Sequence, residues 1–121
     1  MAAGLNVLIV DDEDIVHETL TGFLKELGHQ VESAWDGNKA LERIQNNDAY
    51  SLALIDVRMP GMDGLALLEQ VRELRPTLRV VMMTGHGDPT MAEKASELGA
   101  LEFIIKPVRL MELMEILDKV D

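Results

Sequence analysis

The chain has 121 residues, of which 47% are hydrophobic, and this size suits one compact domain with a buried core. Acidic residues outnumber basic residues by 22 to 11, and the resulting net charge of −11 argues against direct binding to nucleic acid or to an anionic membrane. No cysteine is present, which excludes disulfides and thiolate metal sites. Since neither a signal peptide nor a long apolar run occurs, we expect a cytoplasmic protein whose partner is a cation or a basic surface.

Apolar runs alternate with amphipathic runs along the chain, which predicts successive strand–helix units and a parallel sheet covered on both faces. Strands are predicted over Asn6–Val10, Gln30–Ala34, Ser51–Ile55, Arg79–Met83 and Leu101–Ile105. The first helix is predicted to begin after Asp12 and to end at Gly28, and the second to begin at the turn Asp36–Gly37. The third is predicted over Leu65–Leu74. The fourth follows the irregular stretch Gly85–Pro89 and ends near Gly99, and the fifth is predicted over Arg109–Val120. We therefore expect an α/β architecture with a single domain over residues 1–121.

Polar side chains follow four of the predicted strands. Asp11 and Asp12 follow the first strand, Asp56 the third, Thr84 the fourth and Lys106 the fifth. Because the carboxyl ends of parallel strands share one edge of the sheet, these side chains are expected to converge where ligands bind in such folds. Clustered carboxylates with open positions suit Mg²⁺, and an aspartate beside a cation is suited to attack phosphorus. No phosphate-binding glycine loop or dinucleotide fingerprint is present, which disfavours nucleotide binding.

Four segments resemble, in order and spacing, the receiver domains of bacterial two-component response regulators. They are Val7–Glu13, Asp56–Gly64, Met83–Asp88 and Phe103–Pro107. The resemblance covers essentially the whole chain and implies the CheY-like, flavodoxin-like (βα)5 fold, a doubly wound five-stranded parallel sheet of order 2-1-3-4-5. It also implies a phosphoacceptor signalling domain rather than an enzyme. The expected partner is a sensor histidine kinase or a histidine phosphotransfer protein, and no output domain is expected within these residues.

The resemblance implies that Asp56 accepts a phosphoryl group from a phosphohistidine, that Lys106 pairs with this group and that Thr84 moves to bond it. Thr84 and Phe103 would form a switch pair, in which the ring turns inward behind the hydroxyl. Phe103 stands where the family often has tyrosine, so it lacks a hydroxyl for polar contacts at the surface. The output would be a changed surface on the fourth helix, fifth strand and fifth helix, which a downstream protein or output domain would recognise.

The resemblance also implies a metal site and a set of tuning residues. The ligands of Mg²⁺ or Mn²⁺ would be Asp11, Asp12, Asp56 and the backbone carbonyl of Arg58. The positions expected to tune hydrolysis of the acyl phosphate are Arg58, Gly85 and His86. A cis peptide bond before Pro107 is implied as well.

Other polar residues are given structural interpretations. Glu13 and Asp14 are interpreted as helix caps, because acidic residues favour the first turn of a helix. Asp63 is interpreted as a turn or cap residue. His17 and His29 lack metal-ligand spacing and are expected to be exposed.

The last predicted helix has an apolar face and one apolar residue off it. The residues expected on the apolar face are Leu110, Leu113, Met114, Leu117 and Val120. Met111 falls off this face, and together with Met91 and Phe103 it is a hypothetical partner-binding surface.

Two other functions stay open from the sequence. A Mg²⁺-dependent phosphohydrolase of the haloacid dehalogenase type also uses a strand-tip aspartate, but it has a second aspartate where this chain has Arg58. Alternatively, these residues are the receiver of a longer transcriptional regulator or hybrid kinase. The sequence also leaves open whether the domain stays monomeric or dimerises when phosphorylated.

Overall fold

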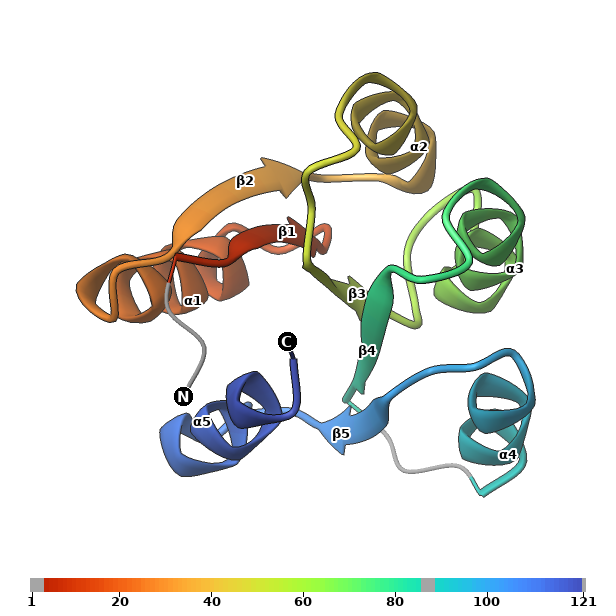
Figure 1. Cartoon of the computed structure of the whole chain (residues 1–121). Coiled ribbons are helices and arrows are strands. Elements are labelled where there is room, and N and C mark those ends of the chain that lie inside the picture. The colour runs from red at the N-terminus through yellow and green to blue at the C-terminus, as the bar shows by residue number, and fades with distance from the viewer. Residues whose placement is uncertain (1–3, 86–88, 121) are drawn as a thin grey trace.

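The computed structural model describes residues 4–85 and 89–120. Strands and helices alternate through these residues (Figure 1). The strands are β1 (Asn6–Val10), β2 (Gln30–Ala34), β3 (Leu52–Asp56), β4 (Arg79–Thr84) and β5 (Glu102–Ile105). The helices are α1 (Asp14–Glu26), α2 (Gly37–Asn46), α3 (Gly64–Leu74), α4 (Pro89–Glu97) and α5 (Leu110–Asp118). Each strand end lies within one residue of its prediction.

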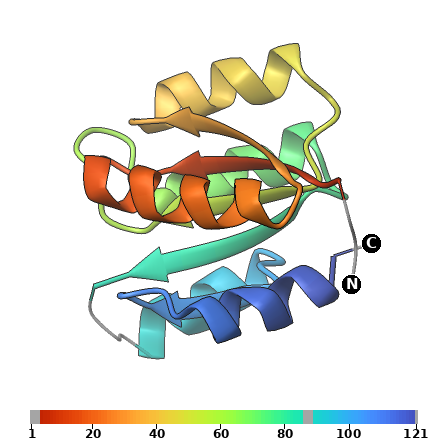
Figure 2. The same ribbon diagram turned by 90° about the vertical axis from the view of Figure 1, so that its left-hand side faces the viewer.

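The strands form one parallel sheet of order β2-β1-β3-β4-β5, as predicted. The register places Val10 beside Ile55, and Thr84 beside Ile105. Since all strands run in the same direction, their carboxyl ends align along one edge of the sheet, on the left in Figure 2. We call this the carboxyl edge and the opposite side the amino edge.

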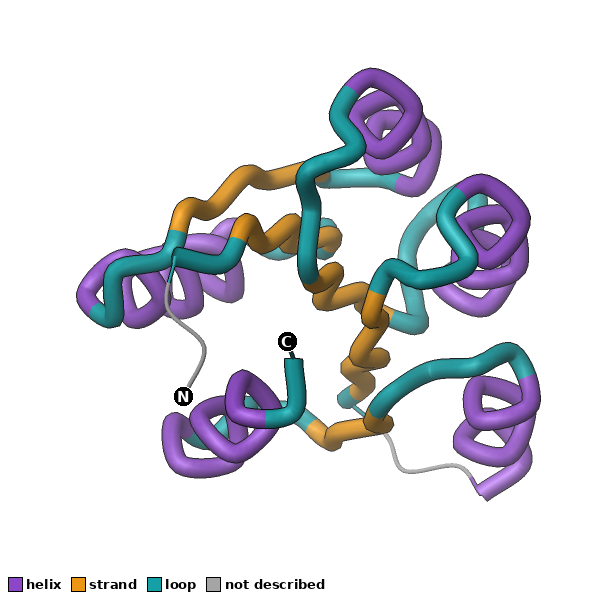
Figure 3. Tube along the Cα trace, in the orientation of Figure 1, coloured by secondary structure: helices purple, strands orange, loops and turns teal. Residues whose placement is uncertain are grey.

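Helices cover both faces of the sheet, with α1 and α5 on one face and α2, α3 and α4 on the other (Figure 1). Alternate residues of each strand point to opposite faces, so Val7 and Ile9 pack toward α1 and α5 while Leu8 and Val10 pack toward the other three helices. Burial on both faces explains why the strands are continuous apolar runs. The tube in Figure 3 shows the connections that join strands to helices at the two edges.

Helix α5 packs on the sheet through a face that differs slightly from the predicted one. Its buried residues are Leu113, Ile116 and Leu117, followed by Val120. The prediction was wrong for Leu110 and Met114, which are 49% and 39% exposed. The prediction left out Ile116, which is buried and shifts the centre of the packed face around the helix axis. At 3.6 residues per turn, Met114 lies roughly 110° and Leu110 roughly 70° around the axis from that centre.

The prediction that His17 and His29 are exposed was also wrong, because each retains only 4% of its exposure. His29 follows Gly28, whose positive φ of 91° ends α1, and its Nδ1 accepts the backbone N–H of Leu5 at 3.1 Å. The ring is buried because it supplies an acceptor at the amino end of β1. The Lys106–Pro107 peptide bond is cis, as the resemblance implies.

None of the helices in the described ranges has the length and apolar composition needed to cross a lipid bilayer.

Candidate functional site

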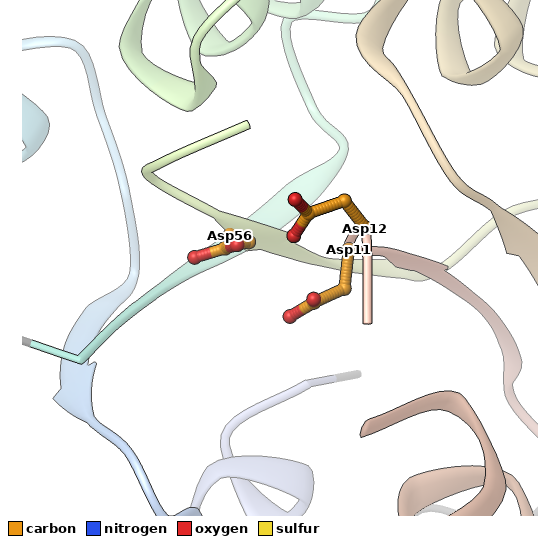
Figure 4. A group of neighbouring side chains, drawn as sticks. All are labelled: Asp11, Asp12 and Asp56. Atoms are coloured by element: carbon orange, nitrogen blue, oxygen red, sulfur yellow. The ribbon is translucent and has the colours of Figure 1, made fainter. Parts of the chain in front are cut away.

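The predicted site residues converge at the carboxyl edge of the sheet. Asp11 follows β1, Asp56 ends β3, Thr84 ends β4 and Lys106 follows β5. Asp11 and Thr84 are fully buried, and Asp56 is 4% exposed. One carboxylate oxygen from each of Asp11, Asp12 and Asp56 lies within 4.8 Å of the other two. Figure 4 shows the three side chains gathered at the ends of the strands. Two strands that are far apart in the sequence therefore supply one carboxylate cluster.

Lys106 provides positive charge to this cluster. Its Nζ lies 2.8 Å from Asp11 Oδ2 and 3.4 Å from Asp56 Oδ1. It also lies 3.3 Å from Glu13 Oε1. Burial by itself lowers the pKa of Lys106, but the neighbouring carboxylates of Asp11 and Asp56 outweigh burial and raise that pKa overall. The ammonium is therefore held in its charged form, yet one positive charge faces several negative ones.

The surplus of negative charge is visible at Asp56. Burial, followed by the charge of Asp11, raises the pKa of Asp56 to about 6. Lys106 and the backbone N–H of Arg58, which donates to Asp56 Oδ1 at 3.4 Å, act in the opposite direction and only partly compensate. A further cation at this site would stabilise the ionised carboxylate.

The oxygen atoms of the site fit a hard divalent cation. Asp11 Oδ1 is occupied by the backbone N–H of Glu13 at 2.9 Å, whereas the buried Asp11 Oδ2 has no well-aligned hydrogen-bond donor in the described residues and only faces the Lys106 ammonium. The side chain of Asp12 is exposed, so the cluster is open to solvent on one side. Mg²⁺ prefers a few carboxylate oxygens together with retained water, which matches this arrangement.

The connection after β3 folds tightly against the tip of that strand. The backbone N–H of Gly64 donates to the Val57 carbonyl at 2.8 Å, and a Cβ on Gly64 would lie 2.3 Å from the Asp56 carbonyl oxygen. Only glycine allows this approach. Asp63 caps α3 by accepting the Ala66 N–H at 2.8 Å, as interpreted from the sequence.

The interpretation of Glu13 and Asp14 as acidic residues at the start of a helix was confirmed in position but not in hydrogen bonding. Glu13 occupies the N-cap position of α1, but its side chain makes no capping hydrogen bond and instead pairs with Lys106. Asp14 Oδ1 accepts the indole N–H of Trp35 at 2.8 Å. Both side chains are drawn to donors that come from distant parts of the sequence.

His17 lies directly behind the cluster, a position that sequence reasoning missed. Its Nε2 is 2.8 Å from the backbone carbonyl oxygen of Asp11, and its Nδ1 is 2.9 Å from Ser33 Oγ. The imidazole packs against Trp35 with 4.1 Å between ring centroids. A lone histidine in a helix gives no sequence signal for such contacts, because they come from β1 and β2.

The remaining predicted residues surround the cluster. Phe103 is half-buried on β5 beside Met82 and packs against the core under α2, α3 and α4. The side chain of Arg58 is exposed, and a Cβ on Gly85 would meet no atom of the described residues within 4 Å. His86 lies outside the described residues. The switch motion of Thr84 and Phe103 and the tuning roles stay predictions.

Comparison with known proteins extends over all of these elements. The family model for the response regulator receiver domain matches residues 7–118. The transcriptional regulatory protein ZraR of Escherichia coli K12 is 38% identical over 116 residues, which cover 95% of this chain and 26% of ZraR. A cyclic di-GMP phosphodiesterase of Thermotoga maritima is 39% identical over 106 residues, which cover 88% of this chain and 28% of that protein. The chain thus spans about a quarter of the length of these relatives.

A solved structure supports the same relationship. The receiver domain protein (CheY-like) from Methanospirillum hungatei JF-1 superposes with a TM-score of 0.91 at 32% identity, covering 97% of this chain and 93% of that one. The coverage of both chains shows that the likeness extends over nearly the whole fold.

Proposed function

Because the chain belongs to the family of response regulator receiver domains, we propose that Asp56 is its phosphoacceptor and that Asp11, Asp12 and Asp56 hold the Mg²⁺ or Mn²⁺ ion used in the transfer. A receiver domain is a phosphoacceptor of two-component signalling, and this role of the chain follows from the family. The observation that carries the residue assignment is the convergence of the carboxylates with Lys106, whose Nζ is 3.4 Å from Asp56 Oδ1.

The transfer begins from a phosphohistidine on a sensor kinase or a histidine phosphotransfer protein. An Asp56 carboxylate oxygen attacks the phosphorus, the O–P bond forms, and the P–N bond breaks with its electron pair returning to the imidazole. Asp11, Asp12 and Asp56 would hold the divalent cation, which would neutralise charge at the phosphoryl oxygens. Lys106, which follows β5, pairs with the same oxygens, and the Thr84 hydroxyl at the end of β4 donates to one of them.

The remaining residues of the site would shape ligand binding and hydrolysis. The backbone carbonyl of Arg58 would complete the metal ligands. Water that reaches the acyl phosphate hydrolyses it, and Arg58, Gly85 and His86 stand where a side chain would control that access. Gly85 is exposed and carries no side chain that could cover the phosphoryl group.

The output surface is proposed on α4, β5 and α5. Large apolar side chains are exposed here: Ile105 is 55% exposed and Met111 is 77% exposed. Leu110 and Met114, which lie outside the packed face of α5, are exposed as well. Movement of Thr84 toward the phosphate would let the Phe103 ring turn inward, and this would change the shape of the surface. The partner that binds this surface is a downstream protein or an output domain.

We further propose that residues 1–121 form one receiver domain that is monomeric at rest and acts in the cytoplasm. Two-component signalling in a longer regulator is the second candidate, because the match to ZraR, whose name is that of a transcriptional regulatory protein, is confined to 26% of its length. Both candidates use the same site, so they differ in the output and not in the chemistry.

Intact mass after incubation with phosphoramidate, with and without Mg²⁺, tests the site. Wild type is expected to gain one labile phosphoryl group only when Mg²⁺ is present, and Asp56→Asn is expected to gain none. Asp63→Asn is the matched control, since it removes a carboxylate that caps α3 on the same connection. A folded wild type that gains no phosphoryl group, or an Asp56→Asn variant that still gains one, would contradict the assignment.

A further inference from the structure

We propose that His17 is a positioning residue for the metal site, because its Nε2–H holds the carbonyl oxygen of Asp11 and so fixes the peptide that joins Asp11 to Asp12. This inference rests on the proposed function, in which both aspartates bind the metal. It assigns to a buried histidine a role in setting metal affinity.

The hydrogen bonds define the state of the His17 ring. A carbonyl oxygen only accepts, so the 2.8 Å contact with the Asp11 carbonyl requires the hydrogen on Nε2. The Ser33 hydroxyl, 2.9 Å from Nδ1, both donates and accepts and therefore satisfies the second nitrogen. Each ring nitrogen is bonded, and the ring is 4% exposed. The imidazole is thus held in one orientation.

Trp35 supports this orientation from the side. Its ring lies against the His17 ring at a centroid distance of 4.1 Å and an interplanar angle of 30°. The indole N–H donates to Asp14 Oδ1 at 2.8 Å, which ties the indole to the start of α1. Contacts from β2, from the residue after β2 and from α1 therefore keep the donor of His17 aimed at the end of β1.

The Asp11–Asp12 peptide needs such a donor because the chain leaves the sheet there. The Asp11 N–H still donates to the Ala34 carbonyl at 3.1 Å, so it continues the ladder between β1 and β2. The Asp11 carbonyl is bonded by His17 instead. Within the described ranges no hydrogen bond or ion pair of the Asp12 side chain is found, so its carboxylate is placed by its backbone alone. Fixing that peptide reduces the ordering that metal binding would otherwise require.

His29 is a natural control for this role. It is buried to the same extent as His17 and also bonds β1, but it accepts the Leu5 N–H at the amino edge. Loss of either ring removes a buried hydrogen bond to the backbone of a residue next to β1, Leu5 for His29 and Asp11 for His17. Only the loss of His17 acts on the end of the strand that carries the carboxylates.

The experiment measures Mn²⁺ binding from the electron paramagnetic resonance signal of the free aqua ion, together with thermal unfolding without metal. His17→Leu is expected to weaken Mn²⁺ binding about tenfold, the lower end of the effect of lost outer contacts in metal sites. His17→Gln is expected to restore most of the affinity, because its amide N–H reaches the same carbonyl. His29→Leu is expected to lower the melting temperature and to leave the affinity unchanged.

The outcomes separate this inference from the proposed function. Equal Mn²⁺ affinity in folded wild type and His17→Leu would overturn the role of His17 while leaving the metal site intact. Absence of saturable Mn²⁺ binding in wild type would overturn both. If His17→Leu does not fold, His17→Asn replaces it, since the shorter amide falls short of the carbonyl. Equal affinity of the Asn and Gln variants would then overturn the inference.

Discussion

The Asp56 carboxylate is buried, and its negative charge destabilises the folded state when no metal is bound. Its carboxylate is nearly inaccessible, and Asp11 adds a second negative charge nearby. The same two causes raise the pKa of Asp56 to about 6. The folded protein therefore binds a proton at Asp56 more tightly than the unfolded chain, in which the pKa has its ordinary value.

Stability is expected to fall as the pH rises from about 4 to about 6, because in that range the unfolded chain releases the Asp56 proton first. Asp56→Asn has no such proton, so above pH 6 it is expected to be more stable than wild type by roughly 1–3 kcal/mol. Urea denaturation of both proteins across this range, with EDTA present, measures the difference. A difference that stays constant with pH would contradict the assignment of the titration to Asp56.

Lys106 opposes these effects, and its removal is expected to raise the pKa of Asp56 further. Lys106→Met takes away the ammonium 3.4 Å from Asp56 Oδ1, which lowers the pKa of that carboxyl in the wild type. The carboxyl carbon resonance of Asp56, followed by NMR during a pH titration, reports the change directly. Lys119→Met, which breaks the exposed pair with Glu102, is the control and should leave the Asp56 titration unchanged.

At the scale of elements, the connection between β3 and α3 depends on one close backbone contact. The Gly64 Cα sits against the peptide that follows Asp56, where an added Cβ would also lie 2.7 Å from the Val57 Cα. The neighbouring atoms belong to the backbone of a buried strand, so they have little freedom to move. Any side chain at Gly64 would therefore displace the tip of β3 or the start of α3.

Gly64→Ala is expected to destabilise the protein by about 3 kcal/mol, at the upper end of the usual cost of overpacking. Gly22→Ala is the matched control, because Gly22 lies inside α1 and a Cβ there would meet nothing within 4 Å. Alanine favours a helix over glycine by roughly 0.5–1 kcal/mol, so this variant should be more stable than wild type. Urea denaturation of the two variants should show shifts of opposite sign; equal shifts would contradict the steric argument.

Sequence reasoning succeeded where a local pattern determines the structure. Each strand is a short apolar run that the sequence shows directly. The convergence of Asp11, Asp56 and Lys106 could be predicted because parallel strands end at one edge of the sheet. Reasoning failed where a side chain responds to distant segments. His17 is buried because Ser33 and Trp35 come beside it from β2 and the residue after β2, and no spacing within α1 indicates this.

At the scale of the whole molecule, a net charge of −11 means that the folded state carries considerable self-repulsion. The cluster at the carboxyl edge concentrates part of it in a buried place, where dissolved salt screens poorly. A bound divalent cation should therefore stabilise the fold more than the same ionic strength of a monovalent salt.

Mg²⁺ at ten times its dissociation constant is expected to stabilise wild type by about 1.4 kcal/mol through binding to the folded state alone. Asp12→Asn removes an exposed carboxylate of the cluster and should lose most of this gain, while keeping the smaller gain from NaCl. Thermal unfolding in MgCl₂ and in NaCl of equal ionic strength separates the two contributions. Equal stabilisation by both salts in wild type would contradict specific binding.

The parallel sheet also separates the ends of the described chain from the site. Leu5 precedes β1, and Val120 follows α5, which runs back from β5, so both residues lie at the amino edge (Figure 2). The carboxylates lie at the other end of the strands, roughly 17 Å away for five residues at about 3.3 Å each. A purification tag or fluorescent protein fused at either terminus would therefore leave the approach of a phosphate donor unobstructed.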